Sequence, residues 1–267
     1  MPLTQLIVLA IIQGLTEFLP ISSSGHLALV DELTGWADQG VLIDVAIHVG
    51  SLFAVLIYFR RDVAELVAGS FSLLRGEMTQ AGRLALYLVA ASIPIFVIGF
   101  AVVNAGLVDG LRAAATIAWA NMIFALLLYW SDKAGGTTRK LEDMTWGQAM
   151  LIGIVQIAAI VPGASRSGVT MMMARFLDFD RREAARFSML LAIPTILGAG
   201  AAATLELAQT ADVTLQGDAV LAAVLSFVAA LASIAIFMRL LEKISLTPFV
   251  IYRVVLGAAL LGWLYLA

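Results

Sequence analysis

The sequence predicts an all-α polytopic membrane protein with six transmembrane helices, two re-entrant helical hairpins and an inverted-topology repeat. Of the 267 residues, 61% are hydrophobic and only 13% are charged, whereas an ordinary soluble domain is about 25% charged. A water-soluble core cannot bury so much apolar surface. Two apolar stretches are interrupted by proline and by serine and glycine clusters, and successive loops alternate in charge.

The six full crossings are the long apolar segments, because a helix needs about 20 apolar residues to span a bilayer. They are residues 41–59, 84–104, 113–131, 184–205, 218–238 and 247–266. Residues 62–74 have the amphipathic pattern of a helix lying on the membrane surface. We treat residues 1–267 as a single membrane domain.

Two further apolar stretches are broken near their middle. Residues 4–19 run into Pro20 and a Ser-Ser-Ser-Gly cluster, and residues 148–161 run into Pro162 and a second Ser/Gly cluster. Each arm is too short to cross the bilayer. Irregular backbone persists at membrane depth only where protein or a wet cavity satisfies its polar groups. We therefore expect two re-entrant hairpins that meet inside the bundle.

The loop charges give an independent indication of topology. One set of loops is basic and contains Arg60, Arg61, Arg75, Arg83, Lys133, Arg139, Lys140, Arg181, Arg182, Arg186, Arg239 and Lys243. The other set contains Asp31, Glu32, Asp38, Asp109, Glu206 and Asp212, with Arg112 as its only cation. The positive-inside rule places the basic loops in the cytoplasm and both termini outside it. Two full crossings per hairpin would give the same parity, so the charges alone do not establish re-entrance.

An internal repeat emerges when the chain is compared with itself at an offset of about 143 residues. The coinciding pairs are Gln5 and Gln148, Gln13 and Gln156, Ser22 and Ser165, Ser24 and Ser167, and Gly25 and Gly168. The halves, approximately 1–135 and 145–267, each contain one hairpin and three crossings. Because three is odd, the second half is inverted relative to the first, and the two hairpins face each other near the midplane.

Composition also limits the chemistry. The chain has no cysteine and only two histidines, so a metal must be held by oxygen ligands. The formal net charge of −3 and the scattered basic residues exclude nucleic acid as a partner.

The first broken stretch contains an oxygen-rich cluster. Gln13 and Glu17 are four residues apart and share one helix face, and a carboxylate inside the membrane is costly. The hydroxyls of Ser22, Ser23 and Ser24 follow. These groups suit Mg²⁺ or Ca²⁺, and the next titratable group, His26, is a candidate proton carrier or nucleophile. For Gln13 alone, a helix–helix hydrogen bond is an equally good interpretation.

The second broken stretch predicts an anion site. Its candidate ligands are Gly163, Ser165, Arg166, Ser167, Gly168 and Thr170. The Ser/Gly cluster opens a short helix, whose N-terminus presents free N–H groups to phosphates, and Arg166 adds a planar fork for two phosphate oxygens. The alternatives are an ion pair of Arg166 with Glu17 and backbone bonding by Ser167 and Thr170.

Two further residues have no assigned role. His48 lies inside a predicted crossing, where packing is at least as good an explanation as catalysis, and Arg253 lies too deep for easy snorkelling.

Residues 13–26 (QGLTEFLPISSSGH) and 162–170 (PGASRSGVT) closely resemble the two signature motifs of the bacterial undecaprenyl-diphosphate phosphatase, or bacitracin-resistance, family. The resemblance extends over the whole chain. It implies hydrolysis of undecaprenyl diphosphate to undecaprenyl phosphate and inorganic phosphate, with a divalent cation, at the periplasmic side of the inner membrane. That reaction recycles the lipid carrier for peptidoglycan synthesis. The family accepts Glu or Gln at the position of Gln13, where Gln makes a weaker metal ligand.

The working hypothesis assigns the phosphates to Arg166 and the amides of 165–168, and the cation to Glu17 with Gln13. Either Ser23 or His26 attacks the terminal phosphorus, and the sequence leaves that choice open. The rival hypothesis is a secondary transporter or flippase of a phosphorylated lipid or small anion, since inverted repeats with broken helices are common there. The metal, the prenyl chain length and the oligomeric state, including a homodimer, are also left open.

Overall fold

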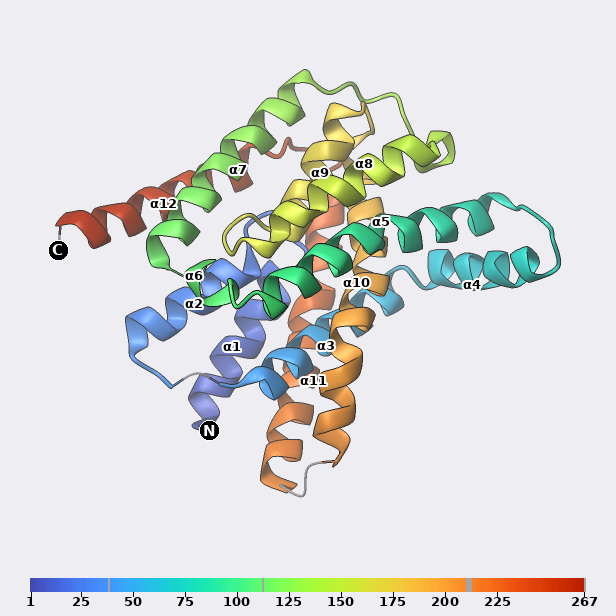
Figure 1. Ribbon diagram of the computed structural model, residues 1–267. Helices are drawn as coiled ribbons and strands as arrows, with labels where there is room; N and C mark the ends of the chain where they lie inside the picture. Colours follow the sequence, from blue (N-terminus) through green and yellow to red (C-terminus); the bar gives the residue numbers. More distant parts are fainter. Residues whose placement is uncertain (38, 112, 210–212, 267) are drawn as a thin grey trace.

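A computed structural model describes residues 1–37, 39–111, 113–209 and 213–266 of the chain. Its regular elements are almost entirely helical (Figure 1). They are α1 (Leu3–Thr16), α2 (Ser23–Thr34), α3 (Val41–Tyr58), α4 (Arg60–Leu74), α5 (Gln80–Asn104), α6 (Val108–Leu111), α7 (Ala114–Ala134), α8 (Trp146–Gln156), α9 (Arg166–Phe176), α10 (Arg181–Gln209), α11 (Val213–Leu240) and α12 (Thr247–Leu266), with 3-10 turns η1 (Leu141–Asp143) and η2 (Ile157–Ile160).

Within this part of the chain, five helices are long and apolar enough to cross a membrane, as expected of a multi-pass membrane protein. They are Val41–Tyr58, Gln80–Asn104, Ala114–Ala134, Leu215–Leu240 and Thr247–Leu266. The sixth predicted crossing falls in α10, where the side chains of Ala199 and 201–209 lie outside the described residues. That crossing stays a prediction. The side of the membrane on which the second set of loops lies also stays a prediction, because its charged side chains lie outside the described ones: Asp31, Glu32, Asp38, Asp109, Glu206, Asp212 and Arg112.

The outward surface of these helices is apolar, as a lipid solvent requires. On α5, Val89, Ile93, Val97 and Phe100 are all more than half exposed and recur at intervals of three or four residues, which places them on one helix face. Such a face would be buried in a soluble protein. The amphipathic segment 62–74 is helical within α4, and its place at the membrane surface remains a prediction.

Close helix packing brings the polar elements together. Helix α3 packs between α10 and α11, while α7 pairs with α12 (Figure 1). At the α3–α11 contact, a Cβ added to Gly50 would collide with the carbonyl group of Ala223, so only glycine permits this approach. The hydroxyl of Ser226 donates to the carbonyl oxygen of Ile47 at 2.7 Å nearby. The short helices α1, α2, α8 and α9 contact these longer helices.

Candidate active site

The two broken stretches contain turns that are built alike. Ser22 and Ser165 have φ values of +70° and +71°, a left-handed conformation that non-glycine residues rarely adopt. Each hydroxyl oxygen accepts a hydrogen bond from a backbone N–H three residues later, Gly25 at 3.3 Å and Gly168 at 3.1 Å. The two serines therefore cap α2 and α9 in the same way.

Arg253 of α12 forms hydrogen bonds with both turns and so links them. Its fully buried guanidinium donates to the carbonyl oxygen of Pro20 at 3.2 Å in the first turn. It also donates to Gly163 at 2.8 Å and Ala164 at 3.0 Å in the second. Its Nε atom donates to the side-chain oxygen of Asn121 on α7 at 2.8 Å. The depth of Arg253 is explained by these carbonyl groups, which would otherwise be buried without partners.

Gly163 is required by this arrangement. Its φ is +94°, and a Cβ at this position would collide with the carbonyl oxygen of Ile117 on α7. Ser167 adds a second tie between the turns, because its hydroxyl donates to the carbonyl oxygen of Leu19 at 2.8 Å. Thr170 shares a 2.7 Å hydrogen bond with the hydroxyl of Ser188 and so links α9 to α10.

Glu17 is the centre of the polar cluster. Its Oε2 atom accepts from Gln13 Nε2 at 2.9 Å and from the hydroxyl of Ser23 at 2.7 Å. Its Oε1 atom accepts from Arg166 at 2.7 Å. The Nε2 atom of His48 lies 3.8 Å from Oε2. A buried carboxylate with this many donors is stabilised in its ionised form.

Arg166 takes the ion-pair role that the sequence left as an alternative. Besides Glu17, it donates to the carbonyl oxygen of Ser188 at 3.0 Å, and its guanidinium lies 5.7 Å from the centre of the Phe18 ring. Its side chain is only 12% exposed. Glu17 and Arg166 nevertheless line the same cavity, so the pair occupies a site that a ligand can reach.

That cavity has a volume of about 320 Å³ and lies against α1, α3, α9 and α10. It is lined by Glu17, Asp44, Val45, His48, Arg166, Thr195, Ile196 and Gly200. Two carboxyl groups, an imidazole and a guanidinium thus share a lining that is otherwise mainly apolar, as ligand sites commonly are.

His26 lies apart from this cluster. Its Nε2 atom is 2.6 Å from the hydroxyl oxygen of Tyr252, and its Nδ1 atom is 2.7 Å from the carbonyl oxygen of Ser22. The hydroxyl of Ser23, the other candidate nucleophile, donates to Glu17. Both ring nitrogens of His26 therefore have partners other than the attacking hydroxyl.

The oxygen donors fit a divalent cation. Gln13 is fully buried, and its Oε1 atom has no hydrogen-bond partner although its amide nitrogen binds Glu17. Amide and carboxylate oxygens are ligands of Mg²⁺ and Ca²⁺, so the Oε1 atom of Gln13 and the carboxylate of Glu17 are the groups here that fit such a cation. Among the residues described, no group of three or more acidic or histidine side chains converges. A cation here would need substrate oxygens to complete its coordination.

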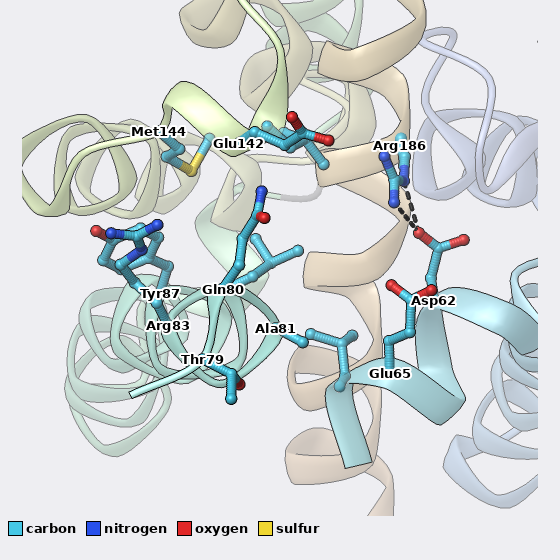
Figure 2. Close-up of a pocket in the computed structure, with 13 residues that line it drawn as sticks. Asp62, Glu65, Thr79, Gln80, Ala81, Arg83, Tyr87, Glu142, Met144 and Arg186 are labelled. Carbon is cyan, nitrogen blue, oxygen red and sulfur yellow. Dashed lines mark hydrogen bonds and ion pairs between the residues drawn. The ribbon is translucent and has the colours of Figure 1, made fainter. Parts of the chain in front are cut away.

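A second cavity, of about 360 Å³, lies between α4, α5, η1 and α10 (Figure 2). Its wall includes Glu65, Arg83 and Glu142, and an ion pair between Asp62 and Arg186 closes one side. None of the predicted site residues lines it.

Sequence reasoning identified most of the cluster but missed some members. Gln13, Glu17, Ser23 and Arg166 meet as expected, whereas Ser22, Ser165 and Gly168 build the turns and Ser24 is exposed. The missed residues are Asp44, Asn121 and Ser188, whereas His48 and Arg253 were noticed in the sequence without an assigned role. The i, i+4 pair Asp44 and His48 within an apolar crossing was a usable signal, since both side chains fall on one helix face.

Known proteins resemble this chain along nearly all of its length. A family model described as bacitracin resistance protein BacA matches residues 6–259. The undecaprenyl-diphosphatase of Dinoroseobacter shibae is 51% identical over 262 residues, covering 98% of each chain. That of Maricaulis maris is 51% identical over 265 residues, also covering 98% of each. That of Roseobacter denitrificans is 48% identical over 266 residues, covering 99% of this chain and 100% of the relative. The chain therefore belongs to the BacA family of bacitracin resistance proteins.

Proposed function

We propose that this protein hydrolyses undecaprenyl diphosphate to undecaprenyl phosphate and inorganic phosphate, recycling the lipid carrier for peptidoglycan synthesis and conferring bacitracin resistance. The full-length relatives named undecaprenyl-diphosphatase support this function. The observation on which it rests most directly is the chain of contacts from Ser23 through Glu17 to Arg166. It joins a nucleophile, a base and an anion-binding group.

Ser23 is the proposed nucleophile. A hydroxyl is a weak nucleophile unless an adjacent base removes its proton. Glu17 Oε2 accepts a hydrogen bond from the Ser23 hydroxyl at 2.7 Å and is placed to remove that proton. The oxygen of Ser23 forms a bond to the terminal phosphorus while the anhydride bond breaks. Undecaprenyl phosphate leaves and takes the proton that Glu17 removed from Ser23, which restores the Glu17 carboxylate. Water then cleaves the phosphoserine and releases inorganic phosphate.

Arg166 and the N-terminus of α9 hold the phosphate groups. The amide groups of 165–167 open the helix and favour an anion there, whereas the N–H of Gly168 already binds the Ser165 hydroxyl. Arg166 binds Glu17 before substrate arrives, so it exchanges a carboxylate for phosphate oxygens on binding. Charge neutralisation of this kind supplies most of the catalysis in phosphoryl transfer.

A divalent cation, Mg²⁺ or Ca²⁺, would be held by Glu17 with Gln13, whose Oε1 atom has no other partner. When bound, it supplies positive charge that neutralises the diphosphate and the developing transition state. Its remaining ligands would be phosphate oxygens and water.

The proposed architecture has six crossings, with α1–α2 and α8–α9 as re-entrant hairpins in inverted halves. The matched turns at Ser22 and Ser165 support it. We place the protein in the bacterial inner membrane with its site open to the periplasm.

Phosphate release from undecaprenyl diphosphate by the purified protein in detergent tests the function. Release that depends on Ser23 supports hydrolysis. Movement of a phosphorylated lipid across sealed vesicles without phosphate release would instead favour the transporter or flippase.

A further inference from the structure

His26 and Tyr252 form a contact that the reaction described above does not use. The hydroxyl oxygen of Tyr252 lies 2.6 Å from His26 Nε2. The two rings are parallel within 1°, with their centres 5.6 Å apart. The residues are 226 positions apart in sequence and belong to α2 and α12, so the contact depends on the folded bundle.

The hydrogen-bond partners define the state of the His26 ring. A carbonyl oxygen can only accept, so Nδ1, at 2.7 Å from the oxygen of Ser22, has the hydrogen. In the neutral ring Nε2 is then an acceptor, and the hydroxyl of Tyr252 donates to it. This is the less common neutral tautomer of histidine, and the tyrosine stabilises it.

The other end of the ring contacts the turn that presents Ser23. The Ser22 carbonyl accepts from both Nδ1 and the backbone N–H of His26. Ser22 has the left-handed φ of +70° that directs the chain into α2. Ser23 follows directly, and its hydroxyl donates to Glu17. Loss of the Nδ1 contact would leave that turn with weaker support.

The position of Tyr252 relative to the site is fixed by its neighbour on α12. The neighbouring Arg253 binds the carbonyl oxygens of both turns, which fixes α12 relative to the site. Tyr252 is 44% exposed beside the exposed Ile251 and Val255. Its hydroxyl therefore points inward from the apolar surface of α12 to the His26 ring. Among the described contacts, it is the only hydrogen-bond partner of His26 Nε2.

We propose that Tyr252 is a positioning residue for the phosphatase site. Its hydroxyl holds His26 as the Nδ1-protonated imidazole, His26 supports the Ser22 carbonyl, and the turn directs Ser23 at Glu17. The proposal rests on the function proposed above and deepens it: His26 acts by geometry, and neither attacks phosphorus nor removes the proton of Ser23.

The test compares Tyr252→Phe, which keeps the ring and removes the hydroxyl, with Tyr265→Phe on the same helix. Tyr265 is 68% exposed and lies near the C-terminal end of α12, 13 residues after Tyr252. In detergent with undecaprenyl diphosphate, Tyr252→Phe should lower kcat roughly tenfold or more, the scale of a misplaced reacting group, with KM changed by less than about threefold. Tyr265→Phe should match the unsubstituted protein.

Nitrogen-15 NMR of protein labelled at its histidines gives a readout that loss of packing alone would not change. The chain has two histidines, and His48 makes the same Nδ1 contact, to the carbonyl oxygen of Asp44 at 2.7 Å. Tyr252→Phe should shift the His26 ring nitrogens toward the other tautomer and leave those of His48 in place. His48 is thus an internal control.

Each outcome decides the matter. A Tyr252→Phe protein with unchanged kcat, or with unchanged His26 signals, overturns the proposal while the phosphatase function stands. Loss of activity in Tyr252→Ala but not in Tyr252→Phe would assign the effect to the ring and also overturn it. If the unsubstituted protein releases no phosphate, the proposed function fails first, and the role of Tyr252 fails with it.

Discussion

The hydroxyl of Ser23 lies 2.7 Å from Oε2 of Glu17, across the break between α1 and α2. Ser23 is the first residue of its helix and Glu17 caps the end of the helix before it. A continuous helix would separate residues six apart onto different faces. The break in the helix therefore creates the contact between the nucleophile and its base.

Replacing Ser23 with Ala should abolish phosphate release, lowering kcat by about a thousandfold or more, because the attacking oxygen is lost. The control is Ser70→Ala, which removes an exposed hydroxyl on α4 and should cost less than about threefold. Acid-quenched unsubstituted protein should contain phosphoserine, and Ser23→Ala should not. An acid-labile phosphoenzyme would identify histidine as the nucleophile instead.

Glu17→Gln keeps the size of the side chain and removes the base. We expect kcat to fall by about 100-fold to 10,000-fold, the usual contribution of a general base. Arg166 would also lose its carboxylate partner in a mostly buried position, so the free energy of unfolding should fall by roughly 3 kcal/mol. Kinetics and thermal unfolding in detergent measure the two effects. A stable, fully active Glu17→Gln protein would remove Glu17 from the mechanism.

Arg166→Lys keeps the charge and loses the planar fork. Activity should fall by about 100-fold, since an ammonium group cannot bind two phosphate oxygens and Ser188 in one plane. Arg182→Lys, at an exposed ion pair with Glu242, is the control and should be near normal. Near-normal turnover of Arg166→Lys would refute the bidentate role.

Chelation of divalent cations should stop phosphate release, and Mg²⁺ should restore it. Gln13→Glu adds a second carboxylate beside Glu17, so the Mg²⁺ concentration that gives half-maximal rate should fall severalfold. Gln80→Glu, on the wall of the second cavity, should leave that concentration unchanged. Equal metal dependence in all three proteins would exclude Gln13 from the cation site.

Arg253→Lys should lower both the stability of the protein and its rate of phosphate release. The guanidinium binds three carbonyl oxygens and Asn121, and a lysine cannot reach all four partners. Unpaired buried carbonyls cost about 1–3 kcal/mol each, so thermal unfolding should occur several degrees lower. The exposed Arg239, replaced with Lys, should behave as the unsubstituted protein.

The sequence predicts the local features of this site well. Proline, serine and glycine clusters locate both turns, and the cost of an intramembrane carboxylate singles out Glu17. The pairing of Glu17 with Arg166 was among the stated alternatives, because opposite charges in facing hairpins stabilise each other. These inferences need only residue type and spacing along the chain.

Contacts between distant helices are what the sequence does not specify. The partner of His26 is Tyr252, whose place depends on how α12 packs. Likewise, Arg253 gains its role from carbonyl groups of turns 90 and 233 residues away. Backbone carbonyl groups have no residue-specific signal in the sequence. A deep arginine could thus be noticed but not assigned.

The Glu17–Arg166 pair described earlier cancels one negative and one positive charge within the site. A lone anion that bound Arg166 would leave Glu17 without its cation, and a lone cation that bound Glu17 would leave Arg166 without its carboxylate. A diphosphate that arrives with its own counterion can bind both groups at once. The pair thus acts as a filter, which admits a charge-matched ligand in preference to a lone ion.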